Sequence, residues 1–155
     1  MIDSIKNFLF NSRALVNKAK SIVIYDKAIT FHGAKNYTEA APLMIQAAEL
    51  GKPDAMTVLG SMYLLGQGVK EDGRAAVHWL QKAINAGYDD AISILGMAYA
   101  TGKAGVHVDI HKAREMLTTA AEKGDAKSAQ MLEMMEKGEG IFAKLKMHKS
   151  SRKLH

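Results

Sequence analysis

The chain has 155 residues, of which 48% are hydrophobic and 24% charged, a composition typical of one globular domain with a sizeable core. It contains no cysteine, which excludes disulfides, thiolate catalysis and cysteine-ligated zinc. The net charge of +5 is concentrated at the end of the chain. The last fifteen residues hold five of the 21 basic residues and no acid, so the other 16 basic residues balance the 16 acids of the body.

No apolar run approaches the roughly 20 residues that a membrane-spanning helix requires. The first twenty residues include an acid, Asp3, and lack the uninterrupted apolar core of a secretory signal. We therefore expect a cytoplasmic protein without a transmembrane span.

Helices are predicted along most of the chain, because each candidate begins near an acid or a hydroxyl side chain and ends at a glycine. Residues 1–11 are expected to form an amphipathic turn or two. Residues 13–32, which contain no proline or glycine, are expected to form one long helix or two nearly continuous ones. Thr38 is expected to cap the next helix, which places Pro42 in its first turn. The further helices are predicted at 39–50, 54–65, 73–86, from 89 or 90 to 101, 110–123 and 125–137.

One stretch of the sequence occurs twice, at residues 55–69 and 91–106. Equivalent residues lie 36 positions apart and include Leu59 with Leu95, Gly60 with Gly96, and Tyr63 with Tyr99. Repetition at a period in the thirties is typical of a solenoid of stacked helix pairs. A glycine in the middle of a helix costs about 1 kcal/mol relative to alanine, so its recurrence at one register predicts a helix pressing on the backbone there.

These repeated residues resemble the Sel1-like repeat, a relative of the tetratricopeptide repeat. In the first full copy the matching residues are Ala55, Leu59, Gly60, Tyr63, Gly66, Gly68, Val69, Asp72, Ala76, Trp79, Lys82, Ala83 and Gly87. The second copy carries one extra residue in its 102–106 loop. It matches at Ala91, Leu95, Gly96, Tyr99, Gly102, Gly105, Val106, Asp109, Ala113, Ala120, Ala121 and Gly124. The resemblance covers a repeat domain at about 20–140, with copies at about 20–51, 54–87 and 90–124 and a degenerate capping helix at 125–140. An N-terminal helical extension (1–19) and a basic tail (141–155) lie outside it.

The resemblance implies an all-α, right-handed solenoid of antiparallel helix pairs whose concave face binds another protein or a peptide. It implies a role as an adaptor or scaffold, and some bacterial members neutralise toxins. The sequence contains no G-x-S-x-G motif, no Walker A loop and no G-x-G-x-x-G after a strand, so a non-enzymatic role without a cofactor is expected. The cysteine-rich branch of the family is a poor match, because this chain has no cysteine. A bacterial adaptor or immunity protein is the narrower interpretation.

Residues on the first helix of each copy that are not repeat signatures are candidates for the concave, partner-binding face. They are Met56, Ser61, Leu64, Met97, Ala100 and Met134. Trp79 aligns with the aromatic position of the repeat and is expected in the core. His107 and His111 have the i, i+4 spacing of a helical metal site, but the alignment makes Asp109 a helix cap and the histidines exposed, so no metal site is expected.

The last part of the chain offers an alternative function. No acidic residue occurs after Glu139. The tail contains five cations, Lys144, Lys146, Lys149, Arg152 and Lys153. Such a tail is able to bind nucleic acid or an anionic lipid surface, and that binding would be strongly salt-dependent. The competing interpretation is a frayed, solvated terminus.

Overall fold

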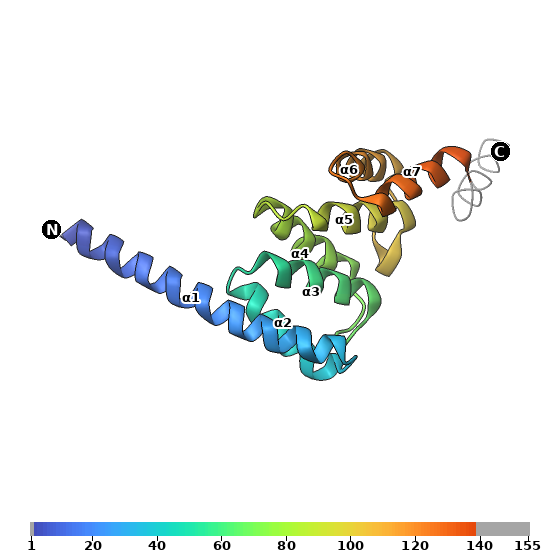
Figure 1. The fold of residues 1–155 in the computed structure, drawn as a ribbon. Coiled ribbons are helices and arrows are strands. Elements are labelled where there is room, and N and C mark those ends of the chain that lie inside the picture. Colours follow the sequence, from blue (N-terminus) through green and yellow to red (C-terminus); the bar gives the residue numbers. More distant parts are fainter. Residues whose placement is uncertain (1, 139–155) are drawn as a thin grey trace. The chain divides into compact units, whose positions relative to one another are not determined.

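The computed structural model describes residues 2–138, which are helical with short connections and contain no strand (Figure 1). The helices are α1 (Ile2–Gly33), α2 (Tyr37–Glu49), α3 (Pro53–Leu65), α4 (Gly73–Asn85), α5 (Asp90–Thr101), α6 (Ile110–Glu122) and α7 (Ala126–Lys137), with a 3-10 turn η1 (Lys103–Gly105) after α5. The all-α prediction is confirmed. The basic tail lies outside the described residues.

The chain divides into two compact units, Met1–Tyr88 with α1 to α4 and Asp89–His155 with α5 to α7. In a repeat protein a helix packs chiefly on its neighbours in sequence, so no single core has to extend through the chain. In the first unit α1 packs on α2, α2 on α3 and α3 on α4, and in the second α6 packs on both α5 and α7.

Aspartates cap three of the helices as the sequence predicts. The Asp72 carboxylate accepts hydrogen bonds from the backbone N–H groups of Arg74 and Ala75 at 2.8 and 3.1 Å, which satisfies two otherwise unpaired donors of α4. Asp109 and Asp125 cap α6 and α7 in the same way. At the other end, α3, α5 and α7 stop at glycines in the left-handed conformation, Gly66, Gly102 and Gly138.

Two boundaries differ from those expected. The first helix is continuous from Ile2 to Gly33, since no proline or glycine interrupts it. The second begins at Tyr37 after Asn36, so Thr38 lies inside the helix instead of capping it, and Pro42 falls in its second turn. Pro42 is exposed there.

The mid-helix glycines lie where the two helices of a pair are in close contact. A Cβ added to Gly60 in α3 would lie 2.6 Å from Cγ of Leu80 in α4, and one added to Gly96 in α5 would lie 3.1 Å from Cγ of Leu117 in α6. Both leucines are fully buried. The predicted pressure of a neighbouring helix on these glycines is therefore confirmed in both copies.

The core of the first unit combines small residues with a few large ones. Its fully buried large side chains are Met44, Leu59, Met62 and Leu80. Trp79, predicted in the core, is only part-buried instead. Because the neighbouring Leu80 takes the position facing α3, the indole lies at the edge of the helix pair, with the Lys82 ammonium 4.8 Å from its centroid.

The loops that join the helices of each copy close in the same way despite their different lengths. The backbone N–H of Asp72 donates to the carbonyl of Tyr63 at 3.0 Å, and that of Asp109 donates to the carbonyl of Tyr99 at 3.0 Å. The extra residue of the second loop is accommodated by η1, in which Ala104 has a positive φ of 56°. The helix-pair packing is thus preserved while the loop changes length.

Candidate partner-binding surface

Three of the six residues predicted to face a partner belong to the core. Met56 is 7% exposed, Leu64 6% and Ala100 0%. Ala100 packs in the core cluster of the second unit with Leu117 and Met135. The prediction is corrected for these three residues: a one-position error in helix phase places an expected surface residue on the packed face, and a buried side chain offers no contact area.

The other three residues are part-exposed and remain candidates. Ser61 donates its hydroxyl hydrogen to the backbone carbonyl of Thr57 at 3.2 Å, so its side chain lies along the surface of α3. Met97 in α5 and Met134 in α7 pack on the rim of the second unit's core and keep part of their surface accessible. Methionine is flexible and polarisable, which suits a surface that adapts to a partner.

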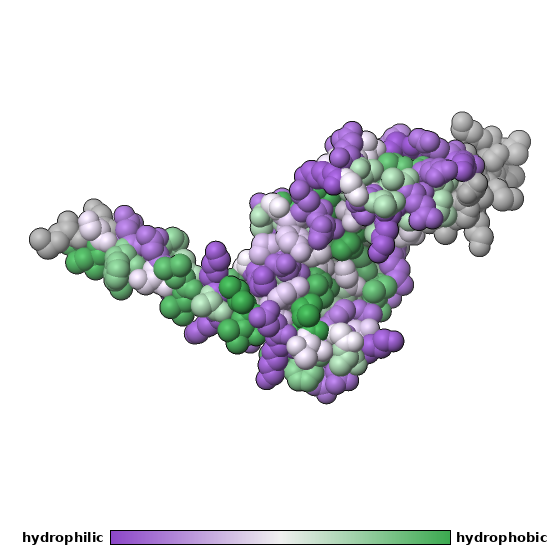
Figure 2. Space-filling view, viewed as in Figure 1, coloured by the Kyte–Doolittle hydropathy of each residue, from purple (hydrophilic) through white to green (hydrophobic). Residues whose placement is uncertain are grey.

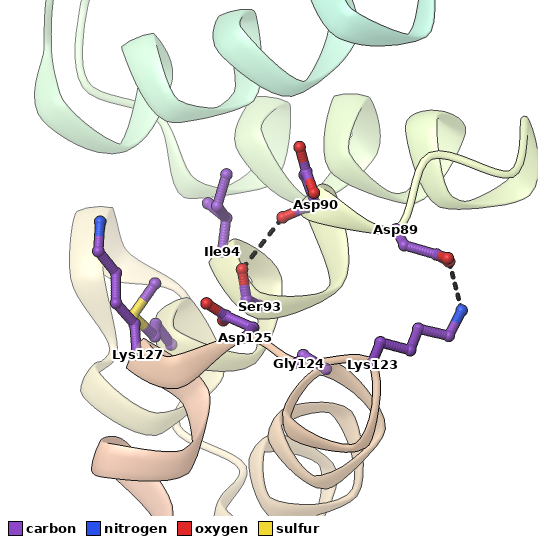
Figure 3. Close-up of a pocket in the computed structure, with 10 residues that line it drawn as sticks. Asp89, Asp90, Ser93, Ile94, Lys123, Gly124, Asp125 and Lys127 are labelled. Carbon is purple, nitrogen blue, oxygen red and sulfur yellow. Dashed lines mark hydrogen bonds and ion pairs between the residues drawn. The ribbon is translucent and has the colours of Figure 1, made fainter.

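Met97 lines an open pocket of about 500 Å³ in the second unit (Figure 3). The first turns of α5, the end of α6 and the start of α7 form its walls. Ile94, Met97 and Ala120 supply apolar surface. The polar residues around them are Asp89, Asp90, Ser93, Lys123, Asp125 and Lys127.

Hydrogen bonds and one ion pair hold the polar residues of this pocket in place. The Lys123 ammonium lies 2.6 Å from the Asp89 carboxylate, and the Ser93 hydroxyl donates to the backbone carbonyl of Asp90 at 3.1 Å (Figure 3). A hydrogen bond from Ser128 lowers the pKa of Asp125 more than burial raises it, and backbone N–H groups and Ser93 lower it further. Asp125 is therefore a carboxylate at neutral pH, beside an apolar wall.

The equivalent place in the first unit is built differently. Tyr88 stands one repeat before Asp125, and its hydroxyl donates to Oδ1 of Asp54 at 3.0 Å. Lys52 binds the other oxygen of Asp54 at 2.8 Å and places its ammonium 4.8 Å from the centroid of the Tyr25 ring. The long Tyr88 side chain thus bridges to α3, whereas the short Asp125 side chain accepts hydrogen bonds from Ser128 in the first turn of its own helix and lines the open pocket.

Burial and hydrogen bonding shift the pKa of Asp54, the carboxylate of this bridge, in opposite directions. Burial raises the pKa of Asp54, but the hydrogen bonds from Lys52 and Tyr88 outweigh it, so the pKa is lowered. Burial, with the nearby carboxylates of Asp54 and Asp26, raises the pKa of Tyr25. At neutral pH Asp54 is therefore a carboxylate and Tyr25 a neutral phenol.

The remaining candidate residues do not converge on a site. His107 and His111 are both exposed, and His107 precedes α6, so the two do not share a helical face. Among the described residues no group of three or more His, Asp or Glu side chains has the geometry to hold a metal ion. The five cations of the tail lie outside the described residues.

Sequence reasoning missed the pocket because its polar residues have ordinary structural interpretations. Asp89, Asp90 and Asp125 were expected only as helix caps, and Lys123 as the end of a helix. The available signal was a break in the repeat, where a tyrosine in one copy becomes an aspartate in the next. Whether this change opens a pocket depends on which atoms each side chain reaches, and the sequence pattern does not predict those contacts.

Comparisons with known proteins identify relatives of this repeat array. The Sel1 repeat profile matches residues 25–52, 53–88 and 89–125. An uncharacterised protein of Neisseria meningitidis serogroup B is 32% identical over 94 residues, which cover 61% of this chain and 20% of that protein. This chain therefore spans about a fifth of the length of that relative.

Two solved structures share the helix arrangement. The crystal structure of a Sel1 repeat protein from Oxalobacter formigenes has a TM-score of 0.64 and 28% identity, covering 74% of this chain and 48% of that one. A protective antigen of uropathogenic Escherichia coli with an SLR fold has a TM-score of 0.68 and 31% identity, covering 76% of this chain and 26% of that one.

Proposed function

Because the chain belongs to the Sel1 repeat family, we propose that it is a non-enzymatic interaction module that holds a peptide or a protein segment in the pocket between α5, α6 and α7. Sel1 repeat proteins are in general protein–protein interaction modules, and their fold is typically a non-catalytic scaffold. The observation that carries the proposal is the open pocket at Met97, which joins apolar surface to fixed charges.

The chemistry of the pocket suits an apolar side chain with a cation beside it. Ile94 and Met97 offer an apolar contact, and the polar rim contains more carboxylates than ammonium groups. Asp89 is already paired with Lys123, so the two remaining carboxylates, Asp90 and Asp125, outnumber the remaining cation, Lys127, by one. The helices around the pocket are ordered without a partner, so little conformational entropy is lost by this chain on binding.

Further contacts and a narrower role belong to the same proposal. Ser61 and Met134 are part-exposed and would contact a partner long enough to extend beyond the pocket. The relatives found in Neisseria, Oxalobacter and Escherichia are bacterial, which supports a bacterial adaptor or immunity protein as the finer role.

Site-specific photo-crosslinking in the native cytoplasm tests the proposed surface. A photoreactive phenylalanine analogue at Met97 is expected to capture a discrete partner, and the Asp90→Lys substitution is expected to reduce that capture at least tenfold. The matched control carries the same analogue at His111, which is exposed on α6 in the same unit. Equal capture from both positions, or capture from His111 alone, would contradict the proposal.

The alternative function gives a different result in the same preparation. A nucleic-acid-binding protein is expected to lose affinity steeply as salt rises and to lose it again on deletion of residues 141–155. A module that binds through the pocket of the second unit retains its partner after that deletion.

A further inference from the structure

The first half of α1 carries an apolar stripe that no part of the first unit covers. At 100° per residue its six residues fall within a sector of about 140° on one side of a helix. Each is more than half exposed, and Figure 2 shows the resulting hydrophobic surface along this helix. The residues are Ile2, Ile5, Phe8, Leu9, Leu15 and Val16.

This stripe lies on the side of α1 that faces away from the rest of the first unit. Farther along the helix, Ser21 and Ala28 are the buried residues, 3% and 0% exposed, and mark the face that packs on the rest of the first unit. At 100° per residue the centre of the stripe is about 150° from that face. Val23 continues the stripe alongside the packed part of the helix and is 70% exposed. The uncovered stripe is therefore about 32 Å long and points outward along its whole length.

Cations flank the stripe, and acids are missing from it. Lys6, Arg13 and Lys20 follow one edge at seven-residue spacing, and Lys18 lies beyond the other edge. Between Asp3 and Asp26 the sequence contains these four cations and no acid. The surface that covers this stripe must therefore be apolar where it meets the helix and negatively charged on both sides of it.

We propose that α1 docks the protein on an anionic lipid surface, with the stripe in the acyl–headgroup boundary and the cations among the phosphates. Most of the exposed aromatic and aliphatic residues of α1 lie on one face beside cations, as in an interfacial helix, whereas Phe10, 73% exposed, lies on the opposite side. The orientation fits a plane, because the stripe and the packed face lie on opposite sides of the same helix. No described helix is both long and apolar enough to cross a bilayer.

A second copy of the chain is the less suitable occupant. The positions 2, 5, 9, 12, 16, 19 and 23 follow a heptad, but the inner positions include Ser12 and Ala19 and end at Asp26, which offer little apolar contact. The positions beside the stripe carry Lys6, Arg13 and Lys20 in every copy. Two such helices would bring like charges together with no acid between residues 4 and 25 to pair with them.

Vesicle flotation with the full chain tests the proposal. The probe is an equimolar mixture of phosphatidylglycerol and phosphatidylcholine, compared with phosphatidylcholine alone at the same salt concentration. The wild type is expected to float at least tenfold more with the anionic vesicles. The double substitution Leu9→Asp/Val16→Asp is expected to abolish flotation, and Lys6→Gln/Arg13→Gln/Lys20→Gln to remove the preference for anionic lipid.

The matched control places the same two charges on the opposite side of the same segment. Asn7→Asp/Ala14→Asp changes the net charge equally at two exposed positions outside the stripe and is expected to retain most of the flotation. All variants should melt like the wild type, because none of these side chains is buried.

Three results would overturn the proposal. The first is no flotation of the wild type with anionic vesicles, which would leave an acidic protein groove as the occupant. The second is undiminished flotation of Leu9→Asp/Val16→Asp, which would assign lipid binding to the basic tail. The third is a dimer in light scattering that this substitution dissociates, which would make the stripe a contact between two copies.

Discussion

Replacing Gly68 by alanine is expected to destabilise the first unit strongly, because the loop between α3 and α4 passes directly against the start of α2. An added Cβ would lie 2.0 Å from the carbonyl oxygen of Tyr37, 2.5 Å from its carbonyl carbon and 3.1 Å from Cβ of Ala41. The first two atoms are backbone held by a helix, so the loop itself has to move. Gly68 also has a φ of +68°, which disfavours a residue with a side chain.

The two effects add to a large loss. A left-handed φ costs a non-glycine residue about 1 kcal/mol, and displacing a packed backbone segment costs about 1–3 kcal/mol. Gly68→Ala should therefore lower the free energy of unfolding by about 3 kcal/mol. For a unit of this size that loss corresponds to a fall of roughly 12–24 °C in the melting temperature.

Gly105 is the matched control, because it occupies the same place in the second copy. Its φ of +76° is equally unfavourable for alanine, but an added Cβ meets nothing within 4 Å. Gly105→Ala should cost only about 1 kcal/mol. Thermal and urea unfolding followed by circular dichroism compares the two variants, and Trp79, the only tryptophan, reports on the first unit by fluorescence. Equal destabilisation by the two substitutions would refute the reasoning.

Four further outcomes are expected. Gly60→Ala should lower the free energy of unfolding by about 1 kcal/mol in urea titrations, because the contact with Leu80 outweighs the gain in helix propensity, whereas Gly96→Ala should stay within about 0.5 kcal/mol of the wild type. Asp72→Ala should lower the free energy of unfolding by about 1 kcal/mol and accelerate amide hydrogen exchange in the first turn of α4. Unchanged stability and exchange would contradict the role of Asp72 as a helix cap. The lowered pKa of Asp54 stabilises the folded state above its ordinary value of 3.8, and this stability is lost as the pH falls through the folded pKa, so Asp54→Asn should flatten the acid limb of a stability–pH profile. Ala104→Gly should raise the melting temperature, since it relieves a φ of 56°, and a lower melting temperature would count against that strain.

The fold was largely predictable because local signals in the sequence agree with the packing. Glycines that end helices and aspartates that begin them set most boundaries to within one or two residues, and the recurring Gly60 and Gly96 correctly indicated close helix contacts. The predictions of burial failed where two adjacent residues of one helix could each have faced the core. Trp79 was expected in the core, but its neighbour Leu80 takes that position.

The candidate site was only partly predictable, because exposure depends on helix phase and on the reach of single side chains. Met97 was proposed from the repeat pattern and lines a pocket, whereas Ala100, three residues further along the same helix, is completely buried. The apolar stripe of α1 was visible in the first eleven residues. That it extends over a continuous helix and remains uncovered follows only from the coordinates.

The loop closed by the backbone bond between Asp109 and Tyr99 offers a practical handle for engineering. One inserted residue is already absorbed there without disturbing the contact between Gly96 and Leu117. An epitope or fluorophore grafted at Ala104 would sit at the opposite end of α5 from the pocket and on a different unit from the N-terminal stripe. Immobilising or labelling the molecule at this point would leave the pocket of the second unit free.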